Sequence, residues 1–255
     1  MKTWVYRTLL GLCAAVALAG CVSISIGLKN KYDNYQAEVT KQKAKDIVEN
    51  VMDSTVRLIG YNEKGEIQGG GTGFVIQVDD QGSWIITDKH VCMMSLMNQA
   101  EVKKSEGIFR FVPIVAVPRR GRPSGAAVTR IAQNSDLCLI RTELKFKKAL
   151  KIAKKVKKGD EIMTFGFPGG KAEFNRGKYL GTTGEALQFY SHTDAKIWYG
   201  ASGSAAVNTN GEVVGVMSNI RFNRAEDKKK PFKREDVAES LFIPLEILRE
   251  FIGGN

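Results

Sequence analysis

The sequence predicts an all-β protein with two packed antiparallel six-stranded β-barrels, a helical arm before them and a helix after them. Short apolar runs with the two-residue period of strands fill two stretches of the 255-residue chain. Glycines and polar turns such as Asp-Asp-Gln-Gly separate the runs, and a basic segment, 144–156, joins the two stretches. With 43% hydrophobic residues, the chain can form one large β core or two small ones.

The first twenty residues have the layout of an export signal. Lys2 and Arg7 precede a short apolar core, 9–19, which is followed by Gly20 and Cys21. The tetrapeptide Leu-Ala-Gly-Cys resembles the lipobox of bacterial lipoproteins, in which small residues precede the cut and the cysteine thiol accepts a diacylglycerol group. We therefore expect residues 1–20 to be a lipoprotein signal peptide and Cys21 to be the lipidated first residue.

Two other interpretations of the N-terminus stay open. Apolar character continues to Leu28, so 9–28 approaches the ~20 residues that cross a bilayer as an uncleaved anchor. An ordinary cleaved signal is the third. All three predict an exported protein. The lipoprotein interpretation adds palmitate, a membrane tether and a place in the cell envelope, facing the periplasm where there are two membranes. Val22 stands where Asp often marks inner-membrane retention, so we expect the outer membrane.

Residues 21–53 are expected to form a tether that becomes an amphipathic helix. This segment is rich in Lys, Glu, Gln and Ala after residue 29. Its apolar residues recur at near-helical spacing, at Tyr35, Val39, Ala44, Ile47, Val48 and Val51. We expect this face to pack on the back of the first barrel, with self-association as the alternative.

The folded domain with the two barrels is expected over 54–255, with barrel one at about 54–143 and barrel two at about 159–244. The strands expected in barrel one are 55–59, 72–78, 83–87, 110–117, 126–132 and 137–141. Those expected in barrel two are 161–165, 178–189, 205–207, 212–220 and 240–243. A terminal helix is expected from Leu245 to Ile252.

A serine flanked by glycines, in the segment 199–205, carries the chemistry. The glycines allow a sharp turn that presents the hydroxyl of Ser202 and turns two backbone amides toward one point. A serine becomes nucleophilic only when a base takes its proton and a carboxylate orients that base. His90 at the end of one apolar strand and Asp136 at the start of another supply these groups. Their order along the chain is that of the chymotrypsin-like peptidases.

Five motifs in one order resemble the HtrA branch of the trypsin-like serine peptidases. They are 71–76, 87–91, 166–169, 193–216 and 242–245. The resemblance implies a chymotrypsin-like serine endopeptidase that cleaves proteins or peptides without metal or other cofactor. It implies the catalytic residues His90, Asp136 and Ser202, and an oxyanion hole formed by the amides of Gly200 and Ser202. HtrA proteins often continue into PDZ domains, and none is expected in this chain.

The chain departs from the family pattern beside the nucleophile. Ser204 and Ala205 stand where Gly-Pro is usual, and a serine there is similar to the glutamyl endopeptidase branch. Residues 197–199 replace the usual Asn-Pro approach to the oxyanion hole. The subfamily therefore stays open, as does an inactive-like oxyanion loop in the resting protein.

The primary specificity pocket is expected to be lined by residues before the serine and on the following strand. These are Lys196, Ile197, Val216 and Met217. Lys196 replaces the Asp that trypsin uses to bind Lys or Arg, so we expect poor cleavage after these residues and a preference for small or medium aliphatic ones. Alternatively, Lys196 selects acidic side chains with help from His192. A lysine usually carries its ammonium to water, which favours the aliphatic prediction and a structural His192.

The cysteines and the charge point to no metal and no nucleic acid. Cys13 and Cys21 belong to the export segment, so Cys92 and Cys138 remain, and we expect both to be small buried apolar residues, although an exported protein could oxidise them. No Cys/His spacing suggests zinc. The net charge is +11, with basic runs at 145–158 and 228–234. We expect solvated loops or attraction to an anionic membrane or acidic substrate, without specific nucleic-acid binding.

Two non-enzymatic functions remain as alternatives. An inactive homologue would keep the barrels and act as a binding module at the cell envelope, but it would not need all three triad residue types. A basic binder of nucleic acid or envelope polymer would bind in a salt-dependent way that survives loss of Ser202.

Overall fold

The computed structural model describes residues 33–34, 36–61, 64–93, 114–185, 188–223 and 231–253. The chain divides into two compact units, residues 1–46 and 47–255. In the first unit, residues 36–46 are helical, and Gln42 Nε2 donates a hydrogen bond to Asp46 Oδ1 at 2.7 Å. Among the helices of this described part, none is long and apolar enough to cross a membrane. The predicted signal and Cys21 lie outside the described residues.

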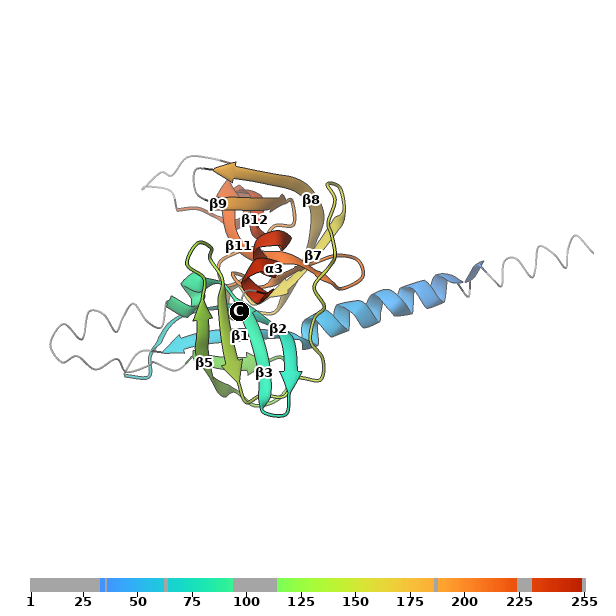
Figure 1. The fold of residues 1–255 in the computed structure, drawn as a ribbon. Coiled ribbons are helices and arrows are strands. Elements are labelled where there is room, and N and C mark those ends of the chain that lie inside the picture. Colours follow the sequence, from blue (N-terminus) through green and yellow to red (C-terminus); the bar gives the residue numbers. More distant parts are fainter. Residues whose placement is uncertain are drawn as a thin grey trace, which may run out of the picture. The chain divides into compact units, whose positions relative to one another are not determined.

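Barrel one is a closed antiparallel sheet in the order β1-β2-β3-β6-β5-β4 (Figure 1). Its strands are β1 Thr55–Tyr61, β2 Ile67–Asp79, β3 Gly82–Thr87, β4 Ile114–Pro118, β5 Ser124–Ile131 and β6 Cys138–Thr142. The sheet closes because β4 pairs with β1. In β6, Cys138, Ile140 and Thr142 are buried, while the two residues between them are half-buried, as expected for a strand with one face in the core.

Barrel two repeats this architecture in the order β10-β11-β12-β9-β8-β7 (Figure 1). Its strands are β7 Glu161–Gly166, β8 Glu173–Glu185, β9 Gln188–Thr193, β10 Ala205–Val207, β11 Val213–Phe222 and β12 Val237–Pro244. Helix α3, Leu245–Gly253, follows directly, so the predicted two barrels and terminal helix are confirmed.

One predicted strand of barrel two is wrong. Residues 178–189 were expected as a single strand, but β8 begins already at Glu173 and pairs antiparallel with β9. The register shifts between Tyr179 and Gly181, and Gly181 has a φ of 121°. Residues 182–184, which follow this point, are exposed. The sequence therefore has no change in apolar pattern that would mark where β8 ends and β9 begins.

The seam between the barrels has its own apolar core. Phe74 and Ile86 of barrel one lie in one cluster with Phe165 and Val216 of barrel two and with Leu248 of α3. The end of the N-terminal helix, residues 47–53, contributes to the same cluster rather than to barrel one alone. The seam therefore buries apolar surface from both barrels, which favours a fixed arrangement of the two.

The segment that joins the barrels also bonds to both of them. The Leu150 amide donates to Val75 O at 2.8 Å in barrel one. The Val213 amide donates to Lys151 O at 2.7 Å, and Ala153 N donates to Val213 O at 2.8 Å, in barrel two. These bonds fix the linker as a short parallel bridge beside β11.

Candidate active site

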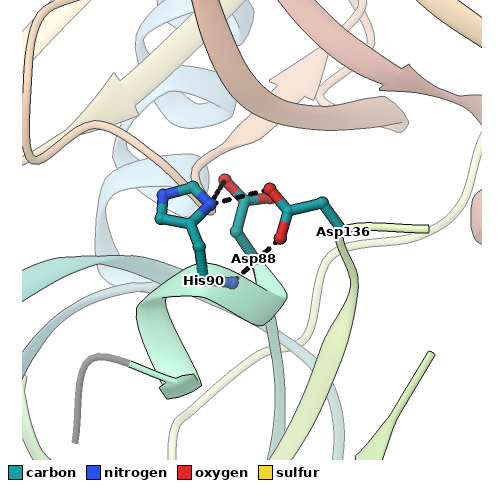
Figure 2. Close-up of side chains that lie close together, drawn as sticks. All are labelled: Asp88, His90 and Asp136. Atoms are coloured by element: carbon teal, nitrogen blue, oxygen red, sulfur yellow. Dashed lines mark hydrogen bonds and ion pairs between the residues drawn. The ribbon is translucent and has the colours of Figure 1, made fainter. Parts of the chain in front are cut away.

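A single turn of helix, residues 89–93, presents His90 at the end of β3. The Asp136 carboxylate makes two contacts with this turn: the His90 amide donates to Oδ1 at 2.9 Å, and ring Nδ1 lies 2.7 Å from Oδ2 (Figure 2). The backbone also helps, since Lys89 N donates to Asp136 O at 3.1 Å. With Asp136 ionised, Nδ1 carries the proton and donates it, which leaves Nε2 as an acceptor.

Asp136 is held as a carboxylate by its neighbours. Burial would raise its pKa, but the hydrogen bonds and charge of His90 outweigh burial and lower it. Ser218 adds a hydrogen bond from its hydroxyl to Oδ2 at 2.9 Å, which acts in the same direction. Since the folded pKa is lowered, this carboxylate stabilises the fold above the ordinary Asp range and loses that contribution as the pH falls.

A disulfide joins Cys92 to Cys138, with the two Cα atoms 6.6 Å apart. Cys92 lies two residues after His90, and Cys138 lies two residues after Asp136. The expectation of two unpaired apolar cysteines is therefore corrected, because the strand ladder between β3 and β6 brings both into one core cluster. The bond links the two segments that carry the histidine and the carboxylate.

The loop before Ser202 forms a tight turn over residues 198–201. The Ala201 amide donates to Trp198 O at 3.0 Å, and Gly200 has a φ of 99°. This is the pattern of a type II turn, whose third residue needs the positive φ that glycine adopts without strain. Residues 197–199 are thus compatible with a well-defined oxyanion loop.

Two backbone amides beside the serine are left without partners in the described structure. Tyr199 O accepts a hydrogen bond from Gly169 N at 2.9 Å, and Ala201 O accepts one from Ser204 N at 3.0 Å. In a trans peptide the N–H points away from the C=O. The amides of Gly200 and Ser202 therefore each point away from the group that binds the carbonyl of the same peptide.

Thr72 of β2 supports the serine loop, although the sequence analysis did not single it out. Its hydroxyl donates to Gly200 O at 2.8 Å and accepts from Phe167 N at 3.0 Å, and its amide donates to Ser202 O at 2.8 Å. Gly203 must lie equally close, since a Cβ there would be 2.1 Å from Thr72 O. Barrel one therefore holds the nucleophile loop of barrel two.

The Ser202 hydroxyl points to a carbonyl in this structure. Its Oγ lies 3.2 Å from Ser218 O, and among the described residues it forms no hydrogen bond with His90. Catalytic hydrogen bonds are often long or misaligned before substrate binds. The Ser202 hydroxyl must therefore release this carbonyl before its proton can reach Nε2.

The four residues expected in the specificity pocket do not lie together. Lys196 is exposed. Ile197 and Met217 are 2% and 0% exposed and share the core of barrel two, whereas Val216 belongs to the seam cluster. Neighbouring residues of a strand point to opposite faces, which separates Val216 from Met217. These apolar side chains are core residues rather than the open lining of a pocket.

His192 has a structural environment on β9. It is 5% exposed, Nδ1 lies 2.9 Å from Glu239 Oε2, and Nε2 bonds the hydroxyl of Thr183. Both ring nitrogens are thus occupied within barrel two. This arrangement agrees with the structural role expected for His192.

Among the described residues, one group of three side chains lies close enough together to be considered as a metal site. Asp88, His90 and Asp136 place one ligand atom each within 4.8 Å of one another. However, His90 Nδ1 and Asp136 Oδ2 are 2.7 Å apart, a hydrogen-bond distance. Two ligands at about 2.0–2.1 Å from a tetrahedral metal lie farther apart, at about 3.4 Å. The spacing favours a hydrogen-bonded pair over a metal site.

Two closed antiparallel barrels, with a histidine–carboxylate pair from one and a glycine-flanked serine from the other, define the chymotrypsin-like class of folds. A model of the trypsin-like peptidase domain matches residues 71–216, more than half of the chain. The chain therefore belongs to the trypsin-like peptidase family.

Relatives place it near the HtrA branch, which confirms the resemblance. "Serine protease HTRA2, mitochondrial" of Drosophila grimshawi is 25% identical over 227 residues, which cover 82% of this chain and 49% of the relative. The protein of the same name from Drosophila virilis is 27% identical over 159 residues, 58% of this chain and 34% of the relative. The chain thus matches half or less of the length of these curated relatives.

The disulfide predicts a measurable stability difference. Replacing both Cys92 and Cys138 by serine should lower the free energy of unfolding by about 2–4 kcal/mol, because the cross-link restricts the unfolded chain. Denaturant unfolding of the oxidised wild type and the double variant measures it. Reductant should move the wild type to the variant's midpoint and leave the variant unchanged. Equal midpoints for the oxidised wild type and the variant would contradict the cross-link.

Proposed function

We propose that this protein is a serine endopeptidase that hydrolyses peptide bonds through Ser202, His90 and Asp136. The observation that carries the proposal is the 2.7 Å contact between His90 Nδ1 and Asp136 Oδ2, which prepares Nε2 to accept a proton. The amides of Gly200 and Ser202, which have no hydrogen-bond partner among the described residues, support it, because an oxyanion needs such donors. Membership in the trypsin-like family agrees with this chemistry.

The reaction follows from these positions. Ser202 Oγ turns from Ser218 O to His90 Nε2, gives up its proton and attacks the substrate carbonyl carbon. The amides of Gly200 and Ser202 bind the oxyanion, and loss of one such donor typically costs about 3–4 kcal/mol of transition-state stabilisation. His90 then protonates the leaving amine, and an acyl-enzyme forms.

Deacylation uses the same groups in reverse roles. His90 takes a proton from a water molecule, the hydroxide attacks the ester, and Ser202 regains its proton. Asp136 stays ionised throughout, holds the imidazole tautomer and stabilises the imidazolium. The lowered pKa of Asp136 supports this role, because the carboxylate has to persist at neutral pH.

We further propose that the protease is exported and tethered to a membrane through Cys21. The signal-like segment 1–20 and the lipobox-like tetrapeptide support this. The Cys92–Cys138 bond supports it independently, because structural disulfides form and persist mainly in oxidising compartments. A protein or peptide substrate at the cell envelope follows, with the periplasm as the location in a bacterium with two membranes.

A second candidate function is a binding module without catalysis. The observation that favours it is the Ser202 hydroxyl, which bonds Ser218 O and not His90. The two functions differ in one property, since only an activated serine reacts with a fluorophosphonate.

The nucleophile assignment predicts that Ser202→Ala lowers kcat on unfolded casein by about 10⁴-fold or more, because the hydroxyl that forms the acyl-enzyme is lost. Fluorophosphonate labelling should disappear with it, and the thermal midpoint should stay near the wild type because no core volume changes. Ser124→Ala, a hydroxyl deletion in barrel one, is the control. Casein cleavage by Ser202→Ala at the wild-type rate would show that the nucleophile is another residue.

The specificity proposal predicts poor cleavage after Lys and Arg. Lys196 stands six residues before Ser202, and the nearby carboxylate Glu173 is already bound to Arg234, so a cationic substrate side chain gains no partner. In a peptide library, kcat/KM after Lys or Arg should be about tenfold or more below that after uncharged residues. Predominant cleavage after Lys or Arg would contradict the proposal.

Two lysine variants test the alternative that Lys196 selects substrates with acidic side chains. Cleavage after Glu or Asp that is lost in Lys196→Ala and kept in Lys154→Ala would establish this alternative. Both lysines are exposed, so neither variant should disturb the core. A profile that is unchanged in both variants would contradict selection by Lys196.

The lipid proposal predicts that radiolabelled palmitate enters the protein at Cys21. Cys21→Ser should abolish labelling and leave the unprocessed precursor, whereas Cys13→Ser, within the signal, should label as the wild type does. The reason is that the thiol of the first mature residue is the acceptor. An unchanged mature mass in Cys21→Ser would favour an uncleaved anchor or another cleavage site.

A further inference from the structure

Asp88, which lies between β3 and the helical turn 89–93, has no role in the mechanism above. Its side chain is 0% exposed. The carboxyl group faces the His90–Asp136 pair (Figure 2), with Oδ2 at 3.8 Å from His90 Nδ1. In the described structure neither carboxyl oxygen has a hydrogen-bond partner. A fully buried carboxyl group beside the catalytic base therefore needs an explanation.

Asp88 and Asp136 differ in how many hydrogen bonds their carboxyl groups accept. Asp136 accepts hydrogen bonds from the His90 amide, the His90 ring and the Ser218 hydroxyl. Asp88 accepts none of them in the described structure. The nearby Gly203 amide donates to Met217 O at 2.7 Å, and this amide and the Ser218 hydroxyl lower the pKa of Asp88 by less than burial raises it. Two neighbouring carboxyl groups cannot both ionise cheaply in a buried site, so the charge stays on Asp136.

Among the described residues, the groups around Asp88 do not offer it a separate cation. His90 faces it from its own helical turn, Asp136 from the loop before β6, and the phenol of Tyr190 from β9. The Lys89 ammonium is engaged with Ala132 O at 3.0 Å. Burial, with the charge of Asp136 added, raises the pKa of Asp88 well above the ordinary value. Burial also raises the pKa of Tyr190, so the phenol stays neutral.

We propose that Asp88 is a positioning residue of the active site, which fills the space behind the His90–Asp136 pair as a neutral carboxylic acid, and whose loss of a proton sets the upper pH limit of proteolysis. The inference rests on the proposed function of His90 and Asp136. It adds a residue for which the mechanism has no other use.

The proposed reaction requires Asp88 to be in its neutral, protonated form. A second negative charge 3.8 Å from Nδ1 would stabilise the imidazolium, so His90 would give up its proton to the leaving amine less readily and would be a poorer general acid. The same charge would oppose the negative oxyanion that develops beside Ser202. Protonated Asp88 keeps the volume filled and leaves one negative charge to orient the ring.

The test is the pH dependence of kcat/KM for the wild type, Asp88→Asn and the control Asp80→Asn. Asn has nearly the shape of a protonated Asp and cannot ionise, and Asp80 is an exposed acid in the β2–β3 turn. In Asp88→Asn the alkaline limb should move up by about one pH unit or more, while the acidic limb, which reports protonation of His90, moves by less than about 0.3.

Either of two results overturns the proposal. A downward movement of the acidic limb by about one pH unit in Asp88→Asn would mean that Asp88 is charged while His90 titrates. An unchanged alkaline limb would mean that Asp88 does not set the upper limit. Asp80→Asn should superimpose on the wild type, so a general effect of lost negative charge is recognised.

Infrared spectroscopy of the wild type decides the protonation state without relying on activity. A C=O stretching band of a protonated carboxylic acid should be present at pH 7, should disappear at alkaline pH, and should be missing in Asp88→Asn but kept in Asp80→Asn. A wild type without this band at pH 7 overturns the proposal even if the variant does not fold. Failure of the proposed function is recognised separately, because Ser202 would then not react with the fluorophosphonate.

Thermal unfolding gives a second readout with a defined sign. Asp88 holds its proton more tightly in the folded than in the unfolded chain, so the wild type loses stability relative to Asp88→Asn as the pH rises above the ordinary Asp range. The midpoint of Asp88→Asn should exceed that of the wild type near pH 8 and equal it near pH 3. Equal midpoints at both pH values contradict a neutral buried acid.

Discussion

The site depends on the close approach of the serine loop to strand β2 of the other barrel. Thr72 binds the loop at two points, through its amide to Ser202 O and through its hydroxyl to Gly200 O. Only a glycine fits at position 203, where a Cβ would collide with Thr72 O and the Thr87 hydroxyl. Since His90 and Asp136 come from barrel one and Ser202 from barrel two, this contact sets their relative placement. The apolar cluster between the barrels and the hydrogen bonds of the linker stabilise the same arrangement.

The sequence predicted most of the fold because alternation and turn residues mark each strand locally. Helix α3 was expected from Leu245, where the structure begins it. The β8–β9 hairpin was missed because its outer half is exposed, so burial imposes no apolar period there. The packing of Met217 against Ile197, with Val216 in another cluster, follows from the two-residue period of β11 and could have been read from the sequence.

The triad residue types and their order were visible in the sequence, but the groups that support them were not. Ser218 lies 82 residues from Asp136, and Thr72 lies 128 residues from Gly200. A single Ser or Thr in a strand carries no local sign of such a contact. Asp88 stood in the histidine motif, yet only its burial and its unpartnered oxygens distinguish it from a turn residue. The pairing of Cys92 with Cys138 likewise depends on the β3–β6 ladder.

The restraints on the three catalytic groups are distributed unevenly. His90 is fixed through its amide, its ring and the nearby disulfide, and Asp136 is fixed by the groups that donate to it. The Ser202 side chain, by contrast, is held by one bond of 3.2 Å to Ser218 O. Rotation about one side-chain torsion costs far less than breaking the His90–Asp136 contacts. Adjustment on substrate binding therefore falls on the nucleophile, while the base and its carboxylate are already in place.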